Sequence, residues 1–386
     1  MKPMKVLFVS HSGELSGGAN RSLLTLIAGL REQYGVEPSV LIPGKGTPLE
    51  ERCRAIGIPV YTGKYHTCCT VLHYTPKDIL RLAKLFAAPI LDAAEARQLH
   101  KELPEDFDLI YTNERMTCVG AYLARLRGTP HVWHVRSFGR ENRTWFPPFW
   151  YRRMGRCSDR IVLISRALYE DFSRRIPSEK LRMVYNGVEP ERYLSRERKA
   201  HPGFRLLLAG RITPAKGQED ALRALYILVR QYGADAYISF AGKVPPYDSP
   251  AYARRLRKLT EQWGLKDRVS FLGEVDDLCA VRSETDVELV CSRMEPFGRV
   301  TVEAMMAGLP VVGCQAGGTA EIILDGKTGL LYPPGDVSAL AERLNRLRER
   351  PELAAEMGRA GRERALRSFT AEQMVSRVME VLHELC

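Results

Sequence analysis

The chain has 386 residues, too many for one ordinary core, and typical domain sizes predict two or three domains. Hydrophobic residues make up 45% and charged residues 27%, which excludes a disordered chain. Lysines and arginines outnumber aspartates and glutamates by 57 to 46, and the formal net charge of +11 predicts a surface that attracts nucleotides, acidic lipids or nucleic acid.

The start of the chain carries no recognisable export signal, because the apolar run at 6–9 is short and polar residues follow it. No run of eighteen uncharged apolar residues occurs, so we expect no membrane span. The nine cysteines are scattered, and the adjacent pair Cys68 and Cys69 lacks metal-site spacing. These features predict a cytoplasmic protein with reduced thiols.

The first half of the chain alternates expected strands with helices. It begins with a strand at 5–10, a glycine loop from Gly13 to Gly18, and a helix at 19–31 with apolar residues at helical spacing. Further strands are expected at 38–42, 108–112, 131–135, 160–165 and 181–185. This alternation predicts a parallel sheet that is covered on both faces.

A charged segment near 194–203 ends in Pro-Gly and is interpreted as a linker, after which the pattern restarts. Strands are expected at 204–209, 236–241, 269–272, 287–291 and 310–313, with helices at 218–231, 252–263, 337–349, 351–367 and 371–385. The sequence therefore predicts two α/β halves, with a ligand at the carboxyl ends of strands in a cleft between them.

Two glutamates, Glu295 and Glu303, lie eight residues apart in the string EPFGRVTVE. Pro296 and Gly298 place the first on a turn, and the second is expected about one turn into a helix that begins near Arg299. The free N–H groups at such a helix start bind phosphate oxygens, helped by the positive end of the helix dipole. Because carboxylates repel phosphate, the glutamates are expected to accept hydrogen bonds from sugar hydroxyls.

Two cations, Arg211 and Lys216, follow the strand expected at 204–209 within a Gly-x-x-x-x-x-Lys-Gly string. A planar guanidinium and a compact ammonium group can together neutralise a diphosphate leaving group. We expect this pair to act mainly on the charge that develops as the diphosphate leaves.

The 295–303 string and its Glu-Ala-Met-x-x-Gly-x-Pro continuation resemble the glutamate-x7-glutamate motif of the retaining glycosyltransferases of family GT4, which have the GT-B fold. Further segments resemble this family: Ser16-Gly17-Gly18-Ala19, Val184-Tyr-Asn-Gly-Val188, Gly210-Arg211 with Lys216-Gly217, Leu272-Gly273 and Gly317-Gly318-x-x-Glu321. The resemblance covers about residues 5–345. It implies two Rossmann-like doubly wound parallel-sheet domains facing across a cleft.

The resemblance also implies a separate role for each part of the chain. Residues 1–195 would form the acceptor-side domain, 203–368 the nucleotide-sugar donor domain, and 369–386 a helix that crosses back to the first domain. At Gly17 and Gly18, backbone amides would approach the donor phosphates or the acceptor.

Within the donor domain, the resemblance implies a role for each motif residue. Glu295 would contact the sugar hydroxyls and Glu303 the ribose hydroxyls. Val300 and Thr301, just after Gly298, would offer backbone N–H groups to the diphosphate. Family members need no bound metal, since fixed positive charge replaces it. Their retention of configuration is drawn as same-face attack, in which the leaving phosphate helps to remove the acceptor proton.

One position departs from the family pattern. The family often has a histidine six residues after a proline that precedes a strand, and from Pro130 that register gives Arg136. His131 and His134 precede it, and His134 shares a strand face with Arg136. Either His134 takes the histidine's role or Arg136 replaces it with a permanent cation, which cannot act as a base. His131 is interpreted as an ordinary strand histidine.

The segment 136–156 mixes aromatic residues with arginines. It could seat the domain on anionic lipid headgroups, bind the phosphate of a lipid-linked acceptor, or simply pack on the first domain. Its aromatic residues are Trp145, Phe146, Phe149, Trp150 and Tyr151, and its arginines are Arg136, Arg140, Arg143, Arg152, Arg153 and Arg156.

The expected function is transfer of a hexose-type sugar from a UDP- or GDP-type nucleotide sugar to a glycan, lipid-linked or small-molecule acceptor, without cofactor or metal. A nucleotide-sugar epimerase and a phosphorylase remain alternatives, although no pyridoxal-phosphate lysine site is identified. A catalytically silent sugar-nucleotide-binding protein is another; the departure at Arg136 favours it, and the intact cations and glutamates oppose it. Nucleic-acid binding is not expected, because no recognised module occurs.

Overall fold

The computed structural model describes residues 2–15, 18–71, 77–104, 107–138, 144–145, 148–194, 198–244 and 250–386. The chain forms two compact units. The first contains Met1–Gly187 together with Ala371–Cys386, and the second contains Val188–Thr370. The division falls inside the Val184–Val188 segment singled out above.

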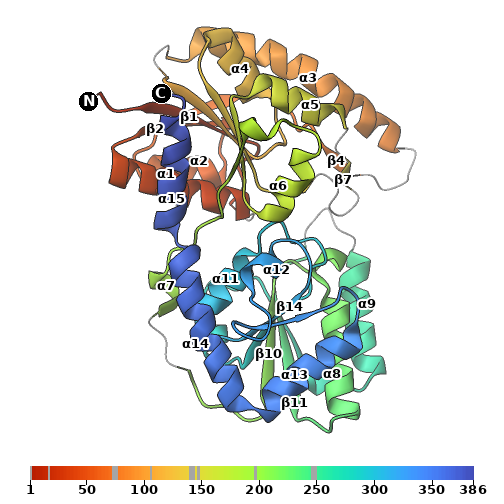
Figure 1. The fold of residues 1–386 in the computed structure, drawn as a ribbon. Coiled ribbons are helices and arrows are strands. Elements are labelled where there is room, and N and C mark those ends of the chain that lie inside the picture. Colours follow the sequence, from red (N-terminus) through yellow and green to blue (C-terminus); the bar gives the residue numbers. More distant parts are fainter. Residues whose placement is uncertain are drawn as a thin grey trace. The chain divides into compact units, whose positions relative to one another are not determined.

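The first unit, in which Figure 1 labels β1 and β2, contains a seven-stranded parallel sheet. The strand order is β3-β2-β1-β5-β6-β8-β9. Its strands are β1 (Lys5–Ser10), β2 (Glu37–Pro43), β3 (Val60–Gly63), β5 (Leu109–Asn113), β6 (His131–Val135), β8 (Arg160–Leu163) and β9 (Leu181–Met183). Alternate residues of β1 enter two apolar clusters, Val6 and Phe8 in one, Leu7 and Val9 in the other. Both faces of this sheet are therefore buried, as predicted.

Helices cover both faces of this sheet. They are α1 (Gly18–Tyr34), α2 (Pro48–Ala55), α3 (Lys77–Glu102), α4 (Val119–Arg127), α5 (Phe149–Cys157), α6 (Arg166–Ser173) and α15 (Ala371–His383), with a 3-10 turn η1 (Ser178–Lys180). A short antiparallel pair, β4 (Thr70–Val71) and β7 (Thr144–Trp145), lies outside the sheet. The C-terminal helix α15 packs on α1, where Met374, Val375 and Val378 enter the same apolar cluster as Leu26 and Ile27.

The second unit contains a six-stranded parallel sheet in the order β12-β11-β10-β13-β14-β15. Its strands are β10 (Phe204–Ala209), β11 (Ala236–Ala241), β12 (Val269–Gly273), β13 (Val287–Val290), β14 (Val311–Cys314) and β15 (Leu330–Tyr332). Its helices are α7 (Glu191–Leu194), η2 (Pro214–Lys216), α8 (Gln218–Arg230), α9 (Pro250–Gln262), η3 (Lys266–Arg268), α10 (Leu278–Ser283), α11 (Arg299–Met306), α12 (Thr319–Ile322), α13 (Val337–Glu349) and α14 (Pro351–Ser368).

In each sheet the strand order reverses once, between β1 and β5 in the first unit and between β10 and β13 in the second. Neighbouring strands at such a point send their following loops in opposite directions, which opens a crevice at their carboxyl ends. These two points are where a doubly wound fold binds ligands, and the predicted fold class is confirmed in both units.

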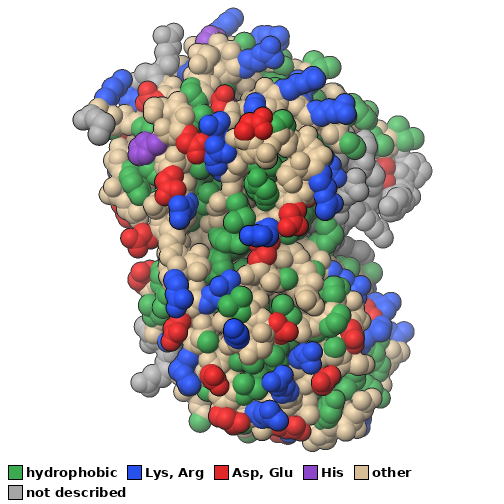
Figure 2. Space-filling model, viewed as in Figure 1, with side chains coloured by type: hydrophobic (Ala, Val, Ile, Leu, Met, Phe, Trp, Pro, Cys, Tyr) green, Lys and Arg blue, Asp and Glu red, His purple; other side chains and the backbone are tan. Residues whose placement is uncertain are grey.

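The surface drawn in Figure 2 carries Lys and Arg side chains over both units, interspersed with acidic ones. Among the described residues, every helix is too short or too polar to cross a bilayer.

Candidate functional site

The carboxyl ends of β10 and β13 bring together the main predicted residues of the second unit. Lys216 ends the turn η2, and Gly217 follows it in the left-handed conformation with φ 71°. A Cβ atom on Gly217 would lie 2.5 Å from the Cys291 backbone oxygen, so only glycine allows this approach. The loop after β10 is thereby held against the loop after β13, where Glu295 lies.

This approach places Lys216 Nζ 2.6 Å from Glu295 Oε2. The two side chains are 25% and 15% exposed, so the pair is reachable from solvent yet partly shielded from it. Arg211 is exposed, and its backbone oxygen accepts a hydrogen bond of 2.8 Å from Gln218 Nε2. The predicted cation and carboxylate therefore meet each other directly, which the sequence did not indicate.

The start of α11 lies beside this pair. Gly298 precedes the helix with φ 101°, and Val300 and Thr301 form its first turn. The hydroxyls of Thr301 and Thr319 are buried and have no hydrogen-bond partner among the described residues. A Cβ on Gly298 would lie 3.0 Å from one hydroxyl and 3.4 Å from the other. An unsatisfied buried hydroxyl costs about 1–3 kcal/mol, which a bound anion would offset.

A second glycine loop supports the Glu295 turn. A Cβ on Gly317 would lie 2.4 Å from the Glu295 backbone oxygen, and one on Gly318 would lie 2.2 Å from that of Phe297. The Gly318 N–H donates to the Glu295 oxygen at 2.8 Å. These two glycines let the loops touch backbone to backbone, which fixes the position of Glu295.

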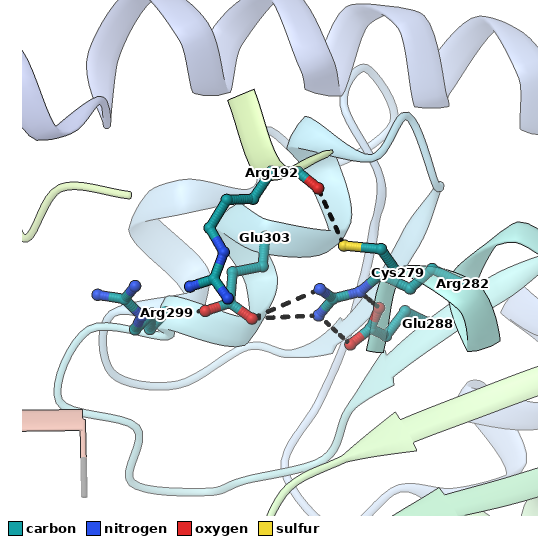
Figure 3. Close-up of polar contacts among 6 residues, drawn as sticks. All are labelled: Arg192, Cys279, Arg282, Glu288, Arg299 and Glu303. Atoms are coloured by element: carbon teal, nitrogen blue, oxygen red, sulfur yellow. Dashed lines mark hydrogen bonds and ion pairs between the residues drawn. The ribbon is translucent and has the colours of Figure 1, made fainter. Parts of the chain in front are cut away.

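The Glu303 carboxylate forms ion pairs with two arginines (Figure 3). Arg299 Nε lies 3.0 Å from Glu303 Oε1, one helical turn away, and Arg282 Nη2 lies 3.4 Å from Glu303 Oε2. The Glu303 carboxylate is thus held from both sides while its side chain stays 14% exposed. A carboxylate fixed in this way is suited to accept hydrogen bonds from a pair of hydroxyls.

Arg282 is itself held by a buried carboxylate. Its Nε and Nη2 atoms lie 2.7 and 3.0 Å from the two oxygens of Glu288, with both side chains almost completely buried. Burial raises the pKa of Glu288, and the charge of Arg282 acts against this. Burial would lower the pKa of Arg282, but the charges of Glu288 and Glu303 outweigh it and raise this pKa. Arg282 therefore remains a cation.

Sequence reasoning missed Arg282 and Glu288. The two residues lie on different elements, α10 and β13, so no helical or strand spacing links them. One signal was available, because Glu288 stands inside the apolar strand Val287–Val290, and a buried carboxylate needs a cationic or hydrogen-bonding partner.

In the first unit, the predicted Arg136 lies at the carboxyl end of β6. It is 6% exposed. Its Nε donates to Asn113 Oδ1 at 2.7 Å, its Nη1 donates to Asn186 Oδ1, and its Nη2 lies 3.1 Å from His134 Nδ1. The Tyr111 hydroxyl contacts the same Nδ1 atom. Since a guanidinium can only donate, Nδ1 is the acceptor and the neutral ring carries its proton on Nε2.

The two histidines of β6 are buried and uncharged at neutral pH. Burial, together with the nearby Arg136 charge, holds the pKa of His134 well below its usual range. Burial lowers the pKa of His131 to about 3. His131 Nε2 lies 2.8 Å from Thr112 Oγ1, which fits the interpretation of an ordinary strand histidine.

Glu114, directly after β5, was not predicted and has an unusual backbone. Its φ is 82°, a left-handed conformation that costs a residue with a side chain about 1–3 kcal/mol. Its buried carboxylate accepts hydrogen bonds from the Arg115 N–H at 2.8 Å and from Ser137 Oγ at 2.9 Å. This strained residue lies at the strand-order reversal of the first unit, near Asn113. No sequence signal marks it, because left-handed glutamate is rare.

Of the remaining predicted residues, some are described by the structure and others lie outside the described residues. Gly18 starts α1 and is exposed, whereas Gly17 lies outside the described residues. In the segment 136–156, Trp150 and Tyr151 are buried and Phe149 is exposed. Phe146, Arg140 and Arg143 also lie outside the described residues, and of Trp145 only the backbone, in β7, is described.

Two family models match consecutive parts of the chain. Glycosyltransferase Family 4 matches residues 16–192, and Glycosyl transferases group 1 matches residues 191–364. Together they account for both units apart from the ends of the chain.

Individual relatives agree with these models. The chain is 28% identical over 333 residues to the N-acetyl-alpha-D-glucosaminyl L-malate synthase of Bacillus anthracis, covering 82% of this chain and 81% of that protein. It is 30% identical over 250 residues to the GDP-mannose-dependent alpha-(1-6)-phosphatidylinositol monomannoside mannosyltransferase of Mycolicibacterium smegmatis, covering 60% and 64%.

A solved structure shares the whole fold. Anabaena Alr3699/HepE, crystallised with UDP and glucose, superposes with a TM-score of 0.78 at 25% identity, covering 99% of this chain and 100% of that one. The fold, the motifs and the relatives lead to one conclusion: the chain belongs to the GT4-type glycosyltransferases of the GT-B fold.

Proposed function

We propose that the second unit binds the diphosphate of a UDP- or GDP-type sugar at the start of α11, and that the enzyme transfers the hexose with retention of configuration and without a metal ion. The observation that carries the proposal is the Lys216–Glu295 ion pair of 2.6 Å beside two unsatisfied buried hydroxyls. A cation, helix N–H groups and hydroxyl donors together suit a diphosphate.

In this proposal each charged residue has one task. The Lys216 ammonium group turns from Glu295 toward the diphosphate, and Arg211 adds a second cation. Glu295 then becomes free to accept hydrogen bonds from the sugar hydroxyls. Glu303, held by Arg282 and Arg299, accepts hydrogen bonds from the ribose.

The chemistry follows from this placement. As the bond between the anomeric carbon and the phosphate oxygen breaks, the electron pair goes to the diphosphate, whose growing charge the cations stabilise. The acceptor hydroxyl attacks the same face, and its proton passes to the leaving phosphate oxygen. No protein nucleophile is needed, so Arg136, which cannot accept a proton, is compatible with this reaction.

The choice of a uridine or guanosine donor is supported by relatives only. Anabaena Alr3699/HepE was crystallised with UDP and with UDP-glucose, and the mycobacterial mannosyltransferase is GDP-mannose-dependent. The acceptor in our proposal is a glycan, a lipid-linked sugar or a small molecule. We also propose a cytoplasmic location for the reaction, which the scattered spacing of the nine cysteines supports.

A melting-shift screen against free UDP, GDP and ADP tests the donor. A nucleotide at 100 times its Kd stabilises the fold by about 2.7 kcal/mol. We expect UDP or GDP to raise the melting temperature and ADP to leave it unchanged, with Lys216→Ala as the variant that weakens the shift. A shift with none of the three, or with ADP alone, contradicts the donor assignment.

A further inference from the structure

The outer side of α3 carries large apolar side chains in contact with solvent. Ile79, Leu80, Phe86, Ile90 and Leu91 are each between 46% and 75% exposed. Single exposed hydrophobic residues are ordinary on a protein surface, whereas a contiguous set marks a binding surface.

These residues are not needed to hold α3 on its own unit. The opposite side of the helix supplies the core contacts through Leu85, Ala88, Ala96 and Leu99, which are buried. The helix is therefore apolar on two sides, and only one of them is covered by the first unit.

Helix α5 extends this surface. The rings of Phe86 and Phe149 stack at a centroid distance of 6.2 Å and an angle of 21°. Phe149 is 45% exposed. Helix α4 packs against both α3 and α5, so the three helices form one side of the unit (Figure 1). We name this set, Ile79, Leu80, Phe86, Ile90, Leu91 and Phe149, the α3–α5 surface.

Among the described residues beside the α3–α5 surface, the exposed charges are cations, because Asp78 and Asp92, which flank the 79–91 stretch of α3, are both buried. Neither α4 nor α5 contains an acidic residue, and none occurs in α3 between Ile79 and Leu91. Exposed cations on α4, on α5 and in the 79–91 stretch of α3 are Lys84, Arg125, Arg152, Arg153 and Arg156. Among the described residues, Lys84, Arg125, Arg152 and Arg156 have no ion-pair partner.

The combination of exposed apolar residues with unpaired cations indicates which class of partner fits this surface. A second copy of the chain related by a two-fold axis would set these arginines against one another, which disfavours self-association through this surface. An anionic lipid bilayer matches both features, since its acyl region receives apolar side chains and its headgroups attract arginine.

We propose that the α3–α5 surface docks the first unit on an anionic lipid bilayer. Ile79, Phe86 and Ile90 enter the boundary between headgroups and acyl chains, while Arg152 and Arg156 contact lipid phosphates. The proposal does not depend on the donor chemistry, since no residue of the donor site belongs to this surface.

Vesicle flotation of the full chain tests the proposal. Phosphatidylcholine vesicles with about 30 mol% phosphatidylglycerol are compared with pure phosphatidylcholine at about 0.1 M salt, where surface charges still interact over roughly 10 Å. We expect binding to the anionic vesicles, and an at least about ten-fold loss in both Phe86→Ser/Ile90→Ser and Arg152→Glu/Arg156→Glu. All variants should keep the wild-type melting temperature and nucleotide melting shift.

The control is a charge reversal on another basic helix. Arg254 and Lys258 on α9 are exposed, and no residue of α9 is among the exposed large hydrophobic side chains of the described chain. Arg254→Glu/Lys258→Glu changes the net charge equally and should keep vesicle binding. Equal loss in this control, no binding by the wild-type protein, or a dimer that Phe86→Ser/Ile90→Ser dissociates without changing lipid binding would each overturn the proposal.

Discussion

Lys216 has a charged partner, Glu295, at 2.6 Å, so its proposed role in catalysis requires it to turn from Glu295 to the diphosphate. The charge on a leaving diphosphate grows toward the transition state, and Lys216 should stabilise that state more than the bound donor. The residue is therefore expected to act on turnover more than on affinity.

Lys216→Ala tests this directly. We expect turnover to fall about 100- to 1,000-fold, the usual effect of removing one donor from an anion hole, with a smaller change in donor affinity. Release of nucleoside diphosphate gives turnover, and titration of the melting shift gives affinity. Lys266→Ala, which changes an exposed lysine in η3 just before the edge strand β12, is the matched control. Wild-type turnover in Lys216→Ala would disprove the role.

Arg282 is expected to have two effects. Its ion pair with Glu288 stabilises the second unit, and its contact with Glu303 orients that carboxylate. Removing Arg282 alone leaves the Glu288 carboxylate buried without its cation, which costs about 3–5 kcal/mol. We expect Arg282→Met to lower the free energy of unfolding by about that amount, as measured by urea denaturation.

The double variant Arg282→Met/Glu288→Met separates the two effects. Replacing both members of a buried ion pair with apolar residues is often neutral, so most of the stability should return. Glu303 would still lack one of its two arginines, and the donor KM should stay several-fold above that of the wild type. A double variant with wild-type KM would show that Arg282 has no part in positioning Glu303.

Strand β6 makes the stability of the first unit depend on pH. His131 is neutral in the folded state down to about pH 3, whereas in the unfolded chain it takes up a proton near pH 6.5. Its folded pKa is therefore depressed, and stability is complete above pH 6.5 and is lost as the pH falls toward 3. At pH 5 this single histidine lowers the free energy of unfolding by about 2 kcal/mol.

Thermal unfolding between pH 7.5 and 5 checks this dependence. We expect His131→Gln to unfold at a lower temperature than the wild type at pH 7.5. Its melting temperature should fall less than that of the wild type on acidification, because glutamine does not titrate. His100→Gln, an exposed histidine of α3, should follow the wild-type profile. Parallel pH profiles for His131→Gln and wild type would contradict the assignment.

The contact between α1 and α15 is close enough for one methyl group to matter. A Cβ on Gly29 would lie 2.5 Å from Val375 Cγ2. Alanine gains about 1 kcal/mol of helix propensity over glycine, whereas overpacking costs about 1–3 kcal/mol, and the β-branched valine has little freedom to rotate away. Gly29→Ala should therefore lower the melting temperature, and adding Val375→Ala should reverse part of that loss. A more stable Gly29→Ala would mean that the helices shift apart freely.

The sequence predicted some elements well and others not at all. The strands β1, β6, β10 and β11 and the helix α13 have the predicted bounds, because each shows a clear apolar run or helical spacing between polar residues. The edge strands β3 and β15 were not predicted, since each has only three or four residues. Helix α3 continues past Pro89, a residue that usually marks a helix end.

The candidate site was predicted in part. The sequence predicted Lys216 at the diphosphate and Glu295 at the sugar hydroxyls next to it, and the structure brings these two side chains together. Their direct contact depends on the approach of Gly217 to Cys291, a tertiary feature that local patterns do not encode. The same holds for Glu114, whose left-handed backbone follows from its surroundings.

The proposed reaction of the complete enzyme needs no metal, since Arg211, Lys216 and the start of α11 supply fixed positive charge. We expect excess EDTA to leave the initial rate of nucleoside diphosphate release unchanged. The matched measurement adds Mg²⁺ after EDTA. A collapse of the rate that Mg²⁺ restores would contradict metal independence.

The route of the chain through the two units also affects how the protein is made. Residues 371–386 belong to the first unit, yet a ribosome synthesises them only after the entire second unit. Until then, the side of α1 that receives Val375 and Val378 lacks its cover, so the nascent first unit carries an open apolar strip. Domains usually mature in order of synthesis. Here the second unit can finish folding before the first, because the first unit is complete only when the last helix has been synthesised. Until then we expect chaperones to bind the exposed strip of α1.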